Sequence, residues 1–222
     1  KLSSYIAQKK LKDIDLIQNK SLELSFFLSM PAMAGLLIAS EEIVSSLFGY
    51  GSFNQEGVEN SSKALFYFAF GLPAFAMIKV FSSFFFARHD TKTPFLISIF
   101  SVFNNFFISL IFFQKIGFII LPIATSISSW INAILLYIFM RKKDLFKFND
   151  LFKFRFPRIV FASICMGVIL YFILDMVSLK IAYDQNLKAF YLLCTFFISL
   201  ISYFLISYFI KAFKISDIKI RY

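Results

Sequence analysis

Lys79 is the residue whose type and position point most directly to chemistry. It stands inside an apolar stretch, nine residues before Arg88, which is about 13 Å along a helix at 1.5 Å per residue. A charge that deep in a bilayer costs about 2.5–3.5 kcal/mol and usually faces a cavity or a partner. An ammonium there could bind an anionic group. The alternative is a structural lysine that snorkels to the surface or is neutralised beside a helix carbonyl.

Other polar residues lie near the middle of apolar stretches. Ser83 follows Lys79 by one helical turn, so the two predict a polar stripe toward a substrate cavity. Asn104 and Asn105, with Ser109 one turn later, favour hydrogen bonds across helices, with an ion or substrate contact as the alternative. The sequence contains no nucleotide-binding glycine loop, no nucleophile beside a base and no metal-ligand spacing. It therefore predicts a protein that is not an enzyme.

The composition indicates that a membrane holds these residues. Hydrophobic residues make up 59% of the chain and charged residues 16%, against about 45–50% and 25% in soluble domains. Six apolar stretches are long enough, at about 20 residues, to cross a bilayer as helices. They cover 22–40, 62–87, 95–113, 117–140, 159–178 and 189–210. We expect an all-α polytopic integral membrane protein with about six transmembrane helices.

The positive charges predict the orientation of these helices. Eighteen Lys and Arg residues lie in one alternating set of flanks and four in the other. Because cytoplasmic loops carry the excess of Lys and Arg, both ends of the chain are expected on the cytoplasmic side. The net charge of +10 is then explained by topology, and suits anionic lipid or an anionic substrate better than nucleic acid.

The same pattern predicts how the chain is divided. Residues 1–20 read as an amphipathic surface helix or, equally, a solvated connector. Residues 21–140 hold four transmembrane helices, and 141–158 form a basic linker. Residues 159–211 hold a terminal helix pair, followed by a tail at 212–222. In the turn before the third helix, Thr93 is expected to cap the helix, with Pro94 at its first position.

Several short motifs occur in a characteristic order. SLFGYGSF at 46–53 precedes a polar loop, then Gly71-Leu72-Pro73, Lys79-Val80 and ARHDTKTP at 87–94. Their order and spacing resemble the MurJ/MviN family of lipid II flippases, in the multidrug/oligosaccharidyl-lipid/polysaccharide exporter superfamily. The resemblance covers almost the whole chain and is strongest from about 21 to 137.

The resemblance implies a fold and a function. Family members have fourteen helices in two lobes, and this chain would be the last six, so the missing N-terminal part of the same protein is an expected partner. Lys79 matches a cavity lysine that could meet the pyrophosphate of lipid II, with Ser83 beside it. The terminal pair would form a groove for the polyprenyl tail. Transport by alternating access in the bacterial inner membrane follows, with no bond broken.

The resemblance also raises the question of a sodium ion, which some family members bind. Asn105 and Thr125 match ligand positions, and Leu121 would offer its carbonyl. Ser109 stands where a carboxylate is expected, which counts against the site. No other cofactor is expected. The competing functions are a sister exporter of another lipid-linked saccharide or a drug, a membrane-embedded transferase, and a passive membrane subunit.

Overall fold

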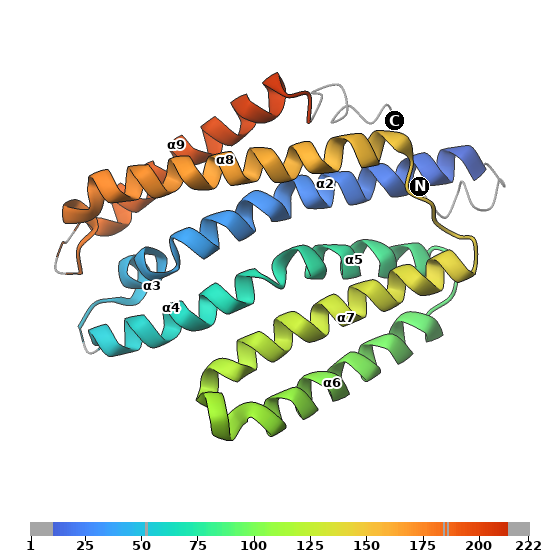
Figure 1. Ribbon diagram of the computed structural model, residues 1–222, viewed down its shortest axis with the longest axis horizontal. Coiled ribbons are helices and arrows are strands. Elements are labelled where there is room, and N and C mark those ends of the chain that lie inside the picture. Colours follow the sequence, from blue (N-terminus) through green and yellow to red (C-terminus); the bar gives the residue numbers. More distant parts are fainter. Residues whose placement is uncertain (1–10, 52, 184, 186, 213–222) are drawn as a thin grey trace. The chain divides into compact units, whose positions relative to one another are not determined.

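The computed structural model describes residues 11–51, 53–183, 185 and 187–212, and every regular element in these residues is helical (Figure 1). The all-α prediction is therefore confirmed. Within the described residues, four helical segments are long and apolar enough to cross a membrane, or five if α4 and α5 form one broken span. One of the four is the 51-residue stretch Lys92–Lys142, which contains both α6 and α7. The count of six transmembrane helices stays a prediction.

The chain divides into two compact units. One comprises the described residues up to Ser29 together with Phe70–Phe154, and the other comprises Met30–Ala69 together with the described residues from Arg155 onward. Helix α2 (Leu11–Ile38) and helix α8 (Asp150–Ile181) each contribute to both units.

The first unit is built around an antiparallel hairpin. Helix α6 (Lys92–Ile116) and helix α7 (Ile120–Lys142) pack against each other and are joined by the short 3-10 helix η1 (Gly117–Ile119) (Figure 1). Gly117 has a φ of +70°, a conformation that side-chain-bearing residues rarely adopt. Helix α5 (Leu72–Phe86) packs on the other side of α7.

Aromatic side chains form the core of this unit. Phe81 and Phe146 are 0% and 1% exposed, and their ring centroids are 5.6 Å apart. Phe148 continues the cluster, with centroids 5.0 Å from Phe146 and 4.9 Å from Phe152. The segment expected to be a basic linker therefore places two phenylalanines in the core, which fixes the path of the chain between α7 and α8.

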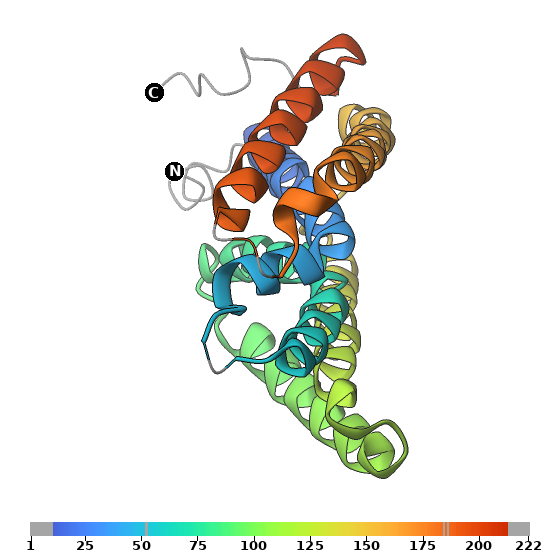
Figure 2. The same cartoon turned by 90° about the vertical axis from the view of Figure 1, so that its left-hand side faces the viewer.

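The second unit contains α3 (Ser40–Phe48), α4 (Gln55–Ala69), α9 (Lys188–Phe209) and most of α8. Helix α3 contacts both α4 and α9, and Figure 2 looks onto it between these two helices. The buried apolar core joins the end of α2 to α8 and α9: Ala39, Leu170, Leu174, Ile181 and Leu192. A Cβ at Gly167 would lie 2.8 Å from the Cδ1 atom of Ile38, so glycine permits the close packing of α8 on α2.

Three of the expected spans differ clearly from the helices that form. Helix α8 begins at Asp150, nine residues before the expected span at 159, so the second half of the expected linker 141–158 is helical. Helix α2 begins by Leu11, eleven residues before the expected span at 22. The helix therefore includes the second half of the expected connector. Residues 1–10 of that connector, and residues 213–222 of the expected tail, lie outside the described residues. The expected span at 62–87 is instead divided, because α4 ends at Ala69 and α5 begins at Leu72.

The break between α4 and α5 has a local cause. Pro73 lacks the N–H that the carbonyl four residues earlier would accept, and Gly71 weakens the helix beside it. Trp130 of α7 donates its indole N–H to the carbonyl of Phe70, at 2.9 Å. The hydrogen-bonding capacity released at the break is thus partly satisfied by a neighbouring helix.

Candidate functional site

Lys79 and Ser83 lie on one exposed face of α5, as their spacing predicts. The Ser83 hydroxyl donates to the carbonyl of Lys79 at 2.8 Å. Within the described part of the chain, the Lys79 ammonium has no hydrogen-bond or ion-pair partner. A lysine neutralised by a nearby helix carbonyl is therefore not what the structure shows. The ammonium is available to an anion, while the role of both residues in binding stays a prediction.

The opposite face of α5 holds this lysine outward. Phe81, Phe84 and Phe85 are 0%, 2% and 0% exposed, and they recur at the spacing of one helix face. Since this face is packed in the core, α5 cannot turn Lys79 inward without exposing three phenylalanine rings. The orientation of Lys79 therefore follows from the apolar pattern of its own helix.

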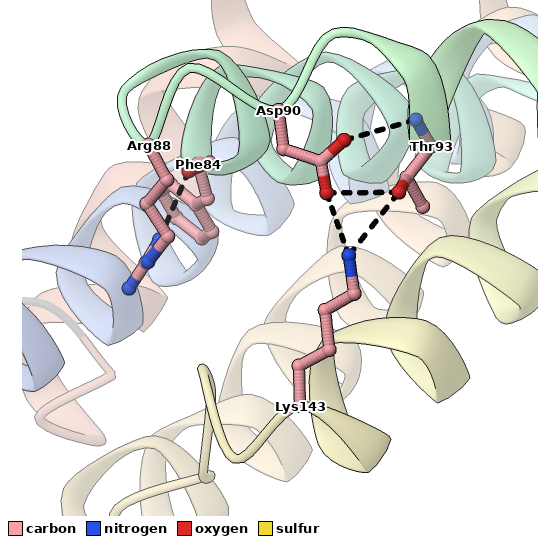
Figure 3. Close-up of polar contacts among 5 residues, drawn as sticks. All are labelled: Phe84, Arg88, Asp90, Thr93 and Lys143. Carbon is pink, nitrogen blue, oxygen red and sulfur yellow. Dashed lines mark hydrogen bonds and ion pairs between the residues drawn. The ribbon is translucent and has the colours of Figure 1, made fainter.

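The turn between α5 and α6 is closed by a carboxylate (Figure 3). Asp90 accepts the backbone N–H of Thr93 at 3.0 Å and the Thr93 hydroxyl at 2.8 Å. Helix α6 begins at Lys92, with Thr91 at the N-cap position and Pro94 in the first turn. The expectation that Thr93 caps the helix with Pro94 first is wrong, because these are the second and third residues of α6, and Thr93 donates to Asp90 instead of accepting.

Lys143 at the end of α7 completes this turn. Its ammonium lies 2.7 Å from the Asp90 carboxylate and 3.3 Å from the Thr93 hydroxyl (Figure 3). The hydrogen bond from Lys143 is the main cause that lowers the pKa of Asp90 to about 2. The aspartate is thus ionised at any ordinary pH, and it joins the α5–α6 turn to α7.

Arg88 makes a second connection beside this turn. Its guanidinium donates to the carbonyl of Phe84 at 2.9 Å (Figure 3) and to that of Leu145 at 3.3 Å. Burial lowers the pKa of Arg88, and the charge of Asp15 opposes that shift. Gln18, which is 0% exposed, can accept from Arg88 and donate to Leu145. The sequence predicts Arg88 only as a topology signal, so its structural bonds were missed.

Asn19 ties the same loop to α2. Its side-chain amide donates to the carbonyl of Lys147 at 2.9 Å and accepts the backbone N–H of Asn149 at 3.0 Å. Asn19 is 1% exposed, so buried amides on α2 and the half-buried guanidinium of the α5–α6 turn hold the loop between α7 and α8. A loop of mixed basic and aromatic residues gives no sequence signal for these contacts.

The polar residues of α6 and α7 meet between the two helices. Asn105 donates to the Thr125 hydroxyl at 3.0 Å, and Thr125 donates to the Leu121 carbonyl at 2.8 Å. Ser109 lies 3.4 Å from the Asn105 side-chain oxygen. The predicted hydrogen bond across helices is confirmed for Asn105. It is wrong for Asn104, whose amide bonds the carbonyl of residue 100 in its own helix.

This cluster bears on the sodium hypothesis. None of its side chains is charged, and its hydroxyl and amide groups already bond one another or a helix carbonyl. Across the described residues, no group of three or more His, Cys, Asp or Glu side chains could hold a metal ion. The cluster satisfies its own hydrogen-bonding needs, and a sodium site at Asn105 and Thr125 stays a prediction.

Lys188 is a buried charge that the sequence did not reveal. It is 0% exposed and donates to the carbonyls of Gly49 and Tyr183, both at 2.7 Å. Its ammonium also lies 4.3 Å from the ring centroid of Tyr50 and 4.7 Å from that of Tyr183, within the range of cation–π attraction. From hydropathy, a lysine at the end of a span is expected to be a surface residue. Tyr50 and Tyr183, in the two loops that face Lys188, were the sequence features that could have indicated a partner for its charge.

Comparisons with known proteins agree on one family. The sequence model of the family described as "Lipid II flippase MurJ" matches residues 1–192. A probable lipid II flippase MurJ of Rhizobium meliloti (strain 1021) is 34% identical over 166 residues, which are 75% of this chain and 31% of that protein. That of Thermotoga maritima is 30% identical over 195 residues, covering 88% of this chain and 37% of that protein.

A solved structure gives the same result. The structure titled "Lipid II flippase MurJ, inward closed conformation" matches with a TM-score of 0.74 and 25% sequence identity, covering 95% of this chain and 42% of that one. The chain spans about a third of the length of the curated relatives it matches. Its apolar helices and its similarity over nearly the full chain lead to one conclusion: this multi-pass membrane protein belongs to the MurJ family.

Proposed function

We propose that the chain is part of a transporter that moves lipid II, the lipid-linked peptidoglycan precursor, from the inner to the outer leaflet of the bacterial inner membrane. The observation that supports this most directly is the outward-facing ammonium of Lys79 on a helix of a MurJ-family chain. Alternating access requires an anionic head group to be held and then released. Electrostatic binding can hold the head group and a conformational change can release it, and no covalent bond is made or broken.

The proposed role of Lys79 is to bind the pyrophosphate of the substrate. A lysine ammonium in a cavity of low dielectric attracts a phosphate strongly. Ser83 lies one turn away on the same face, where its hydroxyl could serve as a further polar contact. In this proposal the rest of the full-length protein, which would precede these last six of fourteen helices, supplies the facing wall of the cavity.

The terminal helices α8 and α9 are proposed to hold the polyprenyl tail. Both carry large exposed apolar side chains, among them Phe161, Phe172, Phe190 and Phe197, at 56–66% exposure. A long isoprenoid chain can bury such surface at about 25 cal/mol per Å² of apolar area. Membrane lipids would cover the remainder.

Genetic complementation tests the assignment. Cells depleted of their own lipid II flippase would receive the full-length gene that encodes this chain, either intact or with Lys79→Ala. Lys115→Ala is the matched control, since it removes a lysine from the end of α6. With membrane expression matched, we expect growth with the intact gene and the Lys115 variant, and loss of growth with the Lys79 variant.

The other outcomes are informative. Growth with Lys79→Ala would keep the flippase assignment and make Lys79 a structural residue. Failure of the well-expressed intact gene would contradict the lipid II assignment and favour a sister exporter with another cargo.

A further inference from the structure

Glu42 is one of the residues that line a cavity in the second unit. The volume of the cavity is about 210 Å³, and it lies between α3, α4 and the end of α8. Its wall is mixed: Val58, Leu174 and Ile181 are apolar, and polar side chains and Tyr183 beyond α8 complete the lining. No residue of α5, the helix that carries Lys79, is among those that line it.

The Glu42 carboxyl has no partner for one of its oxygens. Among the described residues, its Oε2 atom is the one carboxylate oxygen that is buried without a hydrogen bond. An ionised carboxylate buried without a partner is expensive, and the group then binds a proton instead. Burial is the main cause that raises the pKa of Glu42, its own backbone N–H opposes that shift, and the charge of Glu41 adds to it.

The groups that face Glu42 do not supply a positive charge. Helix α3 contributes Glu41, α4 contributes Gln55, α8 contributes Ser178, and the turn after α8 contributes Tyr183. An adjoining cavity shares Glu41 and Gln55 and contains Lys63 and Glu59. These two are paired with each other at 2.6 Å, so Lys63 is engaged away from Glu42.

The turn that carries Tyr183, a lining residue of the cavity, is held by several bonds. Tyr183 donates its hydroxyl to the carbonyl of Phe53 at 2.6 Å. Lys188 bonds the carbonyls of Tyr183 and Gly49 at 2.7 Å. The turn between α8 and α9 is thereby fastened to the loop between α3 and α4.

We propose that Glu42 is a protonation site, whose carboxyl binds a proton when α3, α4 and the end of α8 are packed together and releases it as the pH rises. The neutral acid suits a buried oxygen that has no partner, whereas the carboxylate favours loosening of the packing around it, including that of Tyr183. The cavity is thus a pH-sensitive element of the fold. The inference does not depend on which substrate the protein transports.

Thermal unfolding of the purified full-length protein in detergent tests the proposal between pH 5 and pH 8. A carboxyl whose pKa is raised on folding stabilises the folded state below its unfolded pKa, and this stabilisation is lost as the pH rises through the folded pKa. The wild-type Tm should therefore fall with rising pH relative to Glu42→Gln, which cannot ionise. Glu56→Gln, at an exposed position of α4 outside the cavity lining, is the control and should follow the wild type closely.

Hydrogen exchange of the peptide that spans the α8–α9 turn supplies a second measurement on the wild type alone. After correction for intrinsic exchange, this peptide should exchange faster at pH 8 than at pH 5. Equal pH dependence of Tm in wild type and Glu42→Gln, or equal corrected exchange at the two pH values, would overturn the proposal. So would stabilisation of the wild type, but not of Glu42→Gln, by sodium or magnesium at pH 8, because a metal ion would then be the neutralising group.

Discussion

Charged side chains in the described residues differ in whether the fold supplies them with partners. Asp90 and Lys143 meet at 2.7 Å in a turn that also engages Thr93. Lys79 projects from its helix with no such contact. Because a desolvated charge without a partner is costly, the paired residues are explained by folding alone. Lys79 has no such partner among the described residues, so folding alone does not explain its position, whereas binding of an anionic substrate would.

The Asp90–Lys143 pair should contribute a pH-dependent stability. The pKa of Asp90 is lowered from 3.8 to about 2, so its contribution is complete above the unfolded pKa and is lost as the pH falls through the folded pKa. Because both side chains are partly exposed, Asp90→Asn should lower the free energy of unfolding at pH 7 by only about 1 kcal/mol. Thermal unfolding at pH 7 and at pH 3 would measure both effects.

Asp144→Asn is the matched control for that measurement. Asp144 pairs with Lys147 at 3.5 Å but is 80% exposed, and asparagine tolerates its φ of +50°. Its effect should stay within about 0.5 kcal/mol at either pH. An Asp90 variant as stable as wild type at pH 7 would show that the carboxylate is not a significant anchor of the turn.

At the scale of helices and loops, Lys188 joins two connections that are far apart in sequence. Its ammonium bonds the carbonyl after α3 and another before α9. Lys188→Met keeps the length of the side chain but removes the donor, so two carbonyls and two tyrosine rings lose the charge between them. The free energy of unfolding should fall by about 2 kcal/mol, a typical cost for a lost charged hydrogen bond with partners left buried.

Lys180→Met provides the comparison for Lys188. Lys180 also lies over a tyrosine ring, at 5.1 Å from the centroid of Tyr191, but its side chain is exposed. Its replacement should change stability by less than about 0.5 kcal/mol. Equal effects of the two substitutions in chemical denaturation would argue against the role of Lys188 as an anchor.

The helices were largely predictable from the sequence, whereas their ends and anchors were not. Hydropathy depends on average apolar content, so it marks long spans, and the break before Pro73 is indicated by the proline itself rather than by hydropathy. Hydropathy also does not indicate that α2 continues through a charged segment, because helix formation tolerates charges outside the bilayer. These details depend on backbone hydrogen bonds, which a composition window does not contain.

The candidate site was predictable to the extent that helical spacing determines it. The spacing of Lys79 and Ser83 placed them on one face, and the structure confirms that placement. The contact of Asn105 with another helix was also expected and is confirmed. Lys188 and Glu42 were missed because their surroundings come from three or more elements, which the sequence does not bring together.

At the scale of the whole molecule, the distribution of basic residues predicts an orientation that can be measured. After replacement of Cys165 and Cys194, single cysteines would be introduced at Glu56 and at Lys147, both exposed positions. By the positive-inside rule, Glu56→Cys should react with a membrane-impermeant maleimide in intact spheroplasts, and Lys147→Cys only after permeabilisation. The reverse pattern would contradict cytoplasmic ends, and equal labelling of both would contradict a single orientation.

Trp130 has a consequence for observing this protein. It is the single tryptophan in the 222 residues, and its indole N–H bonds the Phe70 carbonyl at the interruption between α4 and α5. Indole emission depends on the polarity and hydrogen bonding around the ring. The intrinsic fluorescence of this chain is therefore a local optical reporter of that interruption, and rearrangement there can be followed without attaching a dye.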